Sequence, residues 1–220
     1  MAAPSPALPC ERPYFSRSLP LYRAIVAANW EEAEIFFNQN PSAIQSPLNY
    51  NLDTSLHVAA KAGNASFAEK LVAVMPDEGL RRKDVCGQTP LHVAAWHGNV
   101  EVAEILVRRD YNLLYVHTQD GLFPIHFAAR NHRKSKEAFL YFFRLTKDDE
   151  YGQPNPYECG PIGVSILVNL IGSKFYDLAL ELIKMYPDLG RHNGLCSNMS
   201  ALDTIVRFDC PIINKHNLSL

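Results

Sequence analysis

The sequence predicts an all-α solenoid of helix-turn-helix units that repeat about every 34 residues. The histidines His57, His92 and His126 are 35 and 34 residues apart. Each histidine lies near the start of a unit that contains two apolar runs with helical spacing. A polar turn separates the two runs, and this pattern indicates stacked helix pairs. The repeated stretches are TSLHVAAKAGNASFAEKLV (54–72), TPLHVAAWHGNVEVAEILV (89–107) and FPIHFAARNHRKSKEAFLY (123–141).

Local signals within the second stretch agree with this fold. Thr89 is placed to N-cap the first helix, and Pro90 stands at its first position, where a missing N–H costs nothing. Gly98 ends that helix, because a left-handed C-cap favours glycine. The run 100–107 then has the apolar pattern of a second helix. Asp and Gly between units predict tight turns in DVCGQ (84–88) and TQDGL (118–122).

Weaker copies extend the frame in both directions. Upstream, PLYRAIVAANWEEAEIFFN (20–38) has Tyr22 where the histidine stands, and downstream SILVNLIGSKFYDLALELI (165–183) has Val168. A partial copy follows with Asp203, and such an incomplete last repeat favours a shortened protein. The expected boundaries are a flexible Pro-rich arm (1–19), a repeat domain (20–209) and a tail (210–220), with repeats near 20–50, 51–83, 84–119, 120–160 and 161–195 and a partial one at 196–209.

The stretch TPLHVAAWHGNVEVAEIL resembles the ankyrin consensus, and the three central copies match it closely. The outer copies LYRAIVAANWEEAEIFF and ILVNLIGSKFYDLALELIKMYPDL are similar to the cytosolic repeat domain of plant ankyrin proteins with a membrane domain called PGG, the Accelerated Cell Death family. This resemblance implies a protein-binding scaffold in plant defence, cell-death or stress signalling. As an alternative, the chain is the soluble part of a membrane-anchored signalling or transport protein of that family.

Composition gives further evidence about the partner and the location of the protein. A formal net charge of −2 argues against a nucleic-acid partner. Five cysteines without a CxxC pair are typical of reduced thiols in the cytosol. The longest apolar run, 161–172, is about half the length that spans a bilayer. We therefore expect a cytoplasmic protein, with the inner face of the plasma membrane as a second location that the resemblance implies.

The three recurring histidines are expected to be structural. Helices pack about 10 Å apart, so one histidine per unit forms a ladder and not a metal-binding cage. The ankyrin resemblance implies that each ring bonds the cap of its own unit and a neighbouring backbone group. The predicted structural residues are His57, Thr89, Pro90, His92, Gly98 and His126.

No other pattern indicates chemistry. His192, Cys196, Cys210 and His216 have zinc-ligand types, but their spacing fits no finger or ribbon. Cys159 lies in a loop without a partner nominated by its position in sequence, and GxSxG, GxxxxGK and HExxH are absent from the sequence. The sequence therefore predicts no enzyme, no cofactor, no metal and no small-molecule substrate.

Residues displayed at the ends of the first helices are the candidates for contact with another protein. Trp96 is either a binding anchor or a packing residue that leans on the neighbouring helix. The basic run RNHRKSK (130–136) is either a solvated turn or a surface for an acidic partner or anionic lipid. The insert 146–161 is a second candidate surface. The predicted partner-binding residues are Lys61, Trp96, His97, Arg130, Asn131, His132, Arg133 and Lys134.

Overall fold

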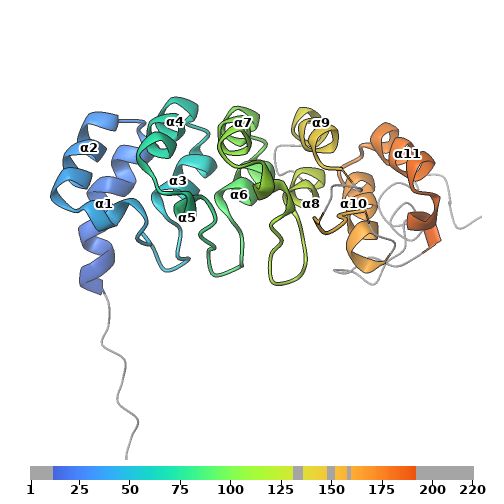
Figure 1. Cartoon of the computed structure of the whole chain (residues 1–220), viewed down its shortest axis with the longest axis horizontal. Coiled ribbons are helices and arrows are strands. Elements are labelled where there is room, and N and C mark those ends of the chain that lie inside the picture. The colour runs from blue at the N-terminus through green and yellow to red at the C-terminus, as the bar shows by residue number, and fades with distance from the viewer. Residues whose placement is uncertain (1–11, 131–135, 148–151, 158–159, 192–220) are drawn as a thin grey trace, which may run out of the picture.

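The computed structural model describes residues 12–130, 136–147, 152–157 and 160–191, and this part of the chain is helical and contains no β-strand. Its main helices form five consecutive pairs that lie in a row (Figure 1). The pairs are α1 (Arg12–Val26) with α2 (Trp30–Gln39), α3 (Ser55–Ala62) with α4 (Ala65–Val74), α6 (Pro90–His97) with α7 (Val100–Arg109), α8 (Pro124–Ala129) with α9 (Lys136–Leu145), and α10 (Pro161–Gly172) with α11 (Tyr176–Met185). The predicted all-α solenoid is confirmed.

Short helices follow several of the pairs. They are η1 (Pro41–Ile44), α5 (Asp77–Leu80), η2 (Tyr111–Tyr115) and η3 (Pro187–Arg191). Among the described helices, none combines the length and the apolar composition needed to cross a membrane.

Each first helix packs on the first helix of the next unit, and the second helices form a parallel row beside them (Figure 1). The same core position recurs along the row: Leu21, Leu56, Leu91 and Ile125 are all fully buried. One apolar core therefore runs through all the described units, and the main contacts between helices join neighbouring units.

Tight turns, which we call tip turns, lead into the first helices. In the turn 84–88, Asp84 Oδ1 accepts hydrogen bonds from the N–H groups of Cys86 (2.9 Å) and Gln88 (2.8 Å). Gly87 takes a φ of +75°, which suits glycine because an L side chain is crowded there. The equivalent tip turns are 49–53 and 118–122.

The first helices end in a left-handed residue in four of the units. Gly63 (φ +77°) and Gly98 (φ +71°) occupy this position in the second and third units. Ala28 lies 35 residues before Gly63 and takes φ +55°, and Lys174 lies 76 residues after Gly98 and takes φ +66°. The cap conformation is thus kept in the outer units without glycine.

The predicted boundary of the N-terminal arm is wrong, because α1 begins at Arg12 and not near Pro20. Residues 12–19 are helical and Pro20 lies inside the helix. The buried Ser18 hydroxyl donates to the carbonyl of Leu48 at 3.0 Å, which ties this early part of α1 to the loop before the second unit. Residues 1–11 and the predicted partial repeat and tail, within 192–220, lie outside the described residues.

The fourth unit also departs from the predicted register. His126 follows His92 by 34 residues, but the buried positions Ala138 and Phe142 follow Val102 and Leu106 by 36. Two extra residues therefore lie between α8 and α9, within the basic run 130–136.

The insert 146–161 is packed against the array where the structure describes it. Tyr157 is buried, its hydroxyl donates to the carbonyl of Thr146 at 3.1 Å, and its ring stacks on Tyr186 with 4.9 Å between centroids. Gln153 Nε2 donates to Asn112 Oδ1 at 3.1 Å. These contacts argue against the described part of the insert as a free contact surface.

Candidate functional site

His92 joins two units through both ring nitrogens. Its Nδ1 accepts from the backbone N–H of Thr89 at 3.1 Å and lies 2.8 Å from the Thr89 hydroxyl. Its Nε2 lies 3.1 Å from the carbonyl oxygen of Leu122 in the next tip turn. A carbonyl can only accept, so the ring is the tautomer that carries its proton on Nε2.

The same arrangement recurs one unit before and one unit after. His57 Nδ1 accepts from the N–H of Thr54 at 3.2 Å, and its Nε2 donates to Gln88 O at 3.0 Å. His126 Nδ1 accepts from the N–H of Phe123 at 3.1 Å, although Phe123 lacks a cap hydroxyl, and its Nε2 donates to Ile162 O at 3.0 Å. The three rings, which we call the histidine ladder, each bind a different carbonyl.

Burial keeps the histidine ladder neutral. Desolvation lowers the pKa of His92 to about 3 and that of His126 to about 4, although hydrogen bonds to backbone groups act in the opposite direction. The pKa of His57 is lowered for the same reason. Neutral rings satisfy one donor and one acceptor each, so these buried polar groups are paired.

The turns between paired helices add a second set of links. Asn64 Nδ2 donates to Ile25 O at 2.8 Å, and Asn99 Nδ2 donates to Ala60 O at 2.6 Å. In the fifth unit Ser173 Oγ donates to Ala129 O at 3.0 Å, the equivalent carbonyl. Each bond ends on the last turn of the preceding unit's first helix, so the polar turn residues also hold the array together.

Trp96 both packs on the next unit and meets a cation. The side chain is half-buried, and its ring centroid lies 6.3 Å from that of Phe127, edge to face. The Arg130 guanidinium lies over the Trp96 ring at 5.4 Å. Both contacts are with residues of the next unit, as the packing interpretation of Trp96 predicts, and the binding interpretation stays a prediction.

Lys61, Trp96 and Arg130 hold equivalent positions at the ends of successive first helices, 35 and 34 residues apart, and Arg130 is the C-cap of α8. Lys61 and Arg130 are exposed and His97 is half-buried. We call Lys61, Trp96 and Arg130 the helix-end row. The remaining predicted contact residues, Asn131, His132, Arg133 and Lys134, lie outside the described residues.

Sequence reasoning missed Phe127, which supports both sites. Its ring lies edge-on to His92, with 5.1 Å between centroids, and also contacts Trp96. The aligned stretches contain the signal, because Val58 and Val93 hold the equivalent position. An aromatic ring at an aliphatic position has the size to reach the preceding helix.

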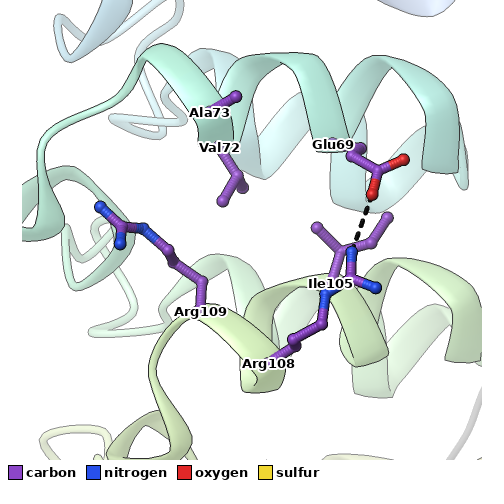
Figure 2. A pocket seen from close by; sticks show the side chains of 6 residues that line it. All are labelled: Glu69, Val72, Ala73, Ile105, Arg108 and Arg109. Atoms are coloured by element: carbon purple, nitrogen blue, oxygen red, sulfur yellow. Dashed lines mark hydrogen bonds and ion pairs between the residues drawn. The ribbon is translucent and has the colours of Figure 1, made fainter.

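A shallow groove of about 410 Å³ lies between the second helices α4 and α7 (Figure 2). Val72, Ala73 and Ile105 give it apolar walls. Arg108 pairs with Glu69 at 2.8 Å, as Figure 2 shows. Arg109 pairs with Asp77 at 2.7 Å. These exposed pairs link neighbouring units at about 0–1 kcal/mol each and leave the groove no free cation to recognise an anion.

Residues suited to metal binding are not brought together in the described part of the chain, where no group of three or more His, Cys, Asp or Glu side chains could hold an ion. The candidate zinc residues His192, Cys196, Cys210 and His216 and the loop residue Cys159 lie outside that part.

The stacked helix pairs, the left-handed caps and the histidine ladder define a helical repeat solenoid. The family model for ankyrin repeats, in three copies, matches residues 21–114 and 56–153. The chain therefore belongs to the ankyrin-repeat family. No curated protein matches it.

Proposed function

We propose that this protein is a non-catalytic scaffold that binds another protein through the helix-end row. Ankyrin repeats are generally protein–protein interaction modules. The ladder histidines and the linking asparagines use their polar groups inside the array. Lys61 and Arg130 instead present their charges at the surface.

The contact between Arg130 and Trp96 supports this proposal most strongly. The guanidinium lies 5.4 Å from the ring centroid, and Phe127 fixes the ring from the next unit. Packing of this kind limits the rotamers of both side chains before binding, which lowers the entropic cost of association. Tryptophan and arginine are also the residues most enriched at interaction hot spots.

The charge of this surface indicates an acidic partner. Arg130 is exposed and opens the basic run 130–136. Lys136, at the end of the run, pairs with Asp177 at 2.8 Å and so links two units. The remaining positive charge favours encounter with a negative surface, and that attraction weakens as salt rises.

A pull-down with the intact chain tests the proposal. Trp96→Ala, and a variant in which Arg130, Arg133 and Lys134 become alanine, should each reduce capture of the partner by ten-fold or more. As a matched control, alanine at Arg144, Lys147 and Lys184 removes three charges elsewhere and should leave capture unchanged. If both variants of the helix-end row capture the partner as well as the parent chain does, the contact surface lies elsewhere on the protein.

We also propose that the protein works in plant defence, cell-death or stress signalling, in the cytoplasm near the inner face of the plasma membrane. The likeness of the outer copies to the PGG-containing Accelerated Cell Death family supports this. Sedimentation with vesicles that contain 30 mol% phosphatidylserine measures the membrane part, since each basic residue adds about 1 kcal/mol of attraction to an anionic surface. Equal sedimentation with neutral phosphatidylcholine vesicles would contradict it.

A further inference from the structure

The first unit forms one end of the row (Figure 1), and a groove of about 550 Å³ lies between its helices α1 and α2. Leu19, Ile35 and Phe36 give this groove an apolar lining. Leu19 is 44% exposed, Ile35 is 59% exposed and Phe36 is half-buried. We call it the end groove. Adjacent exposed apolar side chains of this kind are typical of interaction sites.

In the inner units the same face is covered. Phe36 corresponds to Leu71 and Leu106, 35 and 70 residues later, and both of these are fully buried. Phe67 corresponds to another residue that lines the end groove, and its ring packs edge-on against Trp30 of the preceding unit, with 5.2 Å between centroids. Within the described part of the chain no helix pair covers the end groove in this way.

The end groove carries one charge of each sign. Arg23 on α1 and Glu32 on α2 are the charged side chains among the described residues that line it, and both are exposed. Neither forms an ion pair with another described residue. The short turn 27–29 joins the two helices, which are therefore antiparallel. Arg23 and Glu32 consequently lie at the same level near the turn, and Leu19 and Ile35 lie farther from it.

We propose that the end groove docks against the end groove of a second copy of this chain. A two-fold axis parallel to the helices places α1 of each copy against α2 of the other. Arg23 then faces Glu32 of the other copy and Leu19 faces Ile35, and the symmetry makes each contact twice. Because the two charges of one groove cancel, a partner with a strong net charge of either sign would gain less from this face than a second copy does.

The size of the face indicates a weak dimer. The helix α2 has 10 residues and α1 has 15, and two such helices side by side present on the order of 400 Å². Two copies together therefore bury less than the roughly 1,200 Å² that is typical of stable complexes. The dimer should dissociate on dilution.

Sedimentation velocity of the intact chain between about 5 and 500 µM tests the proposal. The measured mass should rise with concentration towards twice the 24.7 kDa of one chain and no further. Ile35→Asp places a charge in the apolar contact and should raise the dissociation constant by about ten-fold or more. Leu180→Asp adds the same charge at an exposed leucine of α11 (54% exposed) and is the control. Thermal unfolding of each variant checks that it is folded.

Exchange of the two charges tests the symmetry of the contact. Arg23→Glu and Glu32→Arg each place like charges at both contacts, so each variant alone should stay monomeric where the parent chain dimerises. An equimolar mixture of the two variants should dimerise again, because each contact then joins opposite charges. Glu34→Arg makes the same change on α2 at a residue that does not line the groove, and it should leave the dimer unchanged.

The proposed function and this dimer can fail separately. Trp96→Ala lies on α6, two units from the end groove, and should leave dimerisation unchanged. The mass of a single chain over the whole concentration range would overturn the proposal. Growth beyond two copies, or association that Ile35→Asp does not weaken, would overturn it as well. A mixture of the charge variants that stays monomeric while the parent chain dimerises would contradict the two-fold arrangement.

Discussion

The central and outer units of the array reach the same geometry with different residues. The second and third units have the histidine, the glycine cap and the asparagine link. The first and fifth units have Tyr22 and Val168 in place of the histidine, and Ala28 and Lys174 in place of the glycine, yet both keep the left-handed cap. Stacking of the first helices therefore sets the architecture, and the consensus residues add cohesion.

The first unit also differs on its outer side. Glu32 stands where the second and third units bury Phe67 and Val102, and Arg23 stands where they have Val58 and Val93. No described helix pair precedes this unit, so these positions face solvent and carry charge. Charged residues at these two positions suit the end of a solenoid, although Leu19 and Ile35 beside them are exposed apolar residues.

The units that contain a ladder histidine should differ from the others most in how their stability depends on pH. In the unfolded chain histidine has a pKa of about 6.5, and the folded pKa values of His92 and His126 lie near 3 and 4, so the folded state binds fewer protons. The linked stability is complete above pH 6.5 and is lost as pH falls below it. These two residues alone should remove about 3 kcal/mol between pH 7.5 and 5.5, and His57 adds to the loss.

Urea unfolding at several pH values measures this dependence. His92→Gln retains a side chain suited to the capping box but does not titrate, so its loss of stability between pH 7.5 and 5.5 should be smaller by about 1.4 kcal/mol. Constant stability between pH 7.5 and 5.5 would contradict a neutral, buried ladder.

Removal of a ladder side chain should have the next largest effect. His92→Ala leaves the Thr89 N–H and the Leu122 carbonyl without their partner in a fully buried site and opens a cavity. We expect a loss of about 3 kcal/mol in the free energy of unfolding. Val168→Ala, the matched change in the fifth unit, removes a half-buried side chain and should cost about 1 kcal/mol. Equal losses would show that the ladder adds no cohesion.

Much of this comparison follows from the sequence alone. The period of the histidines predicts the stacked units, and Thr89, Pro90 and Gly98 predict one helix of the third unit. The repeat pattern misplaces the second helix of the fourth unit by two residues, because Phe139 and Phe142 occupy buried positions that alignment on His126 does not reveal. Repeat periodicity predicts the units, while turn lengths depend on packing.

The candidate surfaces were less predictable. Trp96 and Arg130 were identified from their places before the turn, but their contact depends on a separation that sequence does not give. Leu52 stands where the other tip turns have glycine, and it takes the same left-handed conformation, which the sequence pattern alone does not reveal. A pattern based on recurring residues gives least information where a unit departs from it.

The cap position sharpens the comparison at a smaller scale. Gly63→Ala should cost about 2 kcal/mol, because φ is +77° and the added Cβ would meet Asn99 Oδ1 at 2.9 Å. Ala28→Gly is the reciprocal change in the first unit and should gain roughly 0.5 kcal/mol, since relief of strain is offset by entropy of the unfolded chain. Chemical denaturation measures both. A loss on Ala28→Gly would show that this cap is not strained.

A smaller loss of stability than at the Gly63 cap is expected at the links between turns. Asn99→Ala removes the bond to the Ala60 carbonyl and should lower the free energy of unfolding by about 1 kcal/mol. Asn38→Ala, on the exposed part of α2, is the control and should stay within about 0.5 kcal/mol of the parent chain. A similar change in the free energy of unfolding for both variants would show that Asn99 does not help to hold the units together.

Nuclear magnetic resonance of the imidazole nitrogens tests most directly whether the recurring histidines hold the units together. His57, His92 and His126 should each show a neutral ring protonated on Nε2, with a pKa below 6.5, in the folded protein. Rings protonated on Nδ1, or titration near pH 6.5 in the folded state, would show that these side chains do not bridge the units.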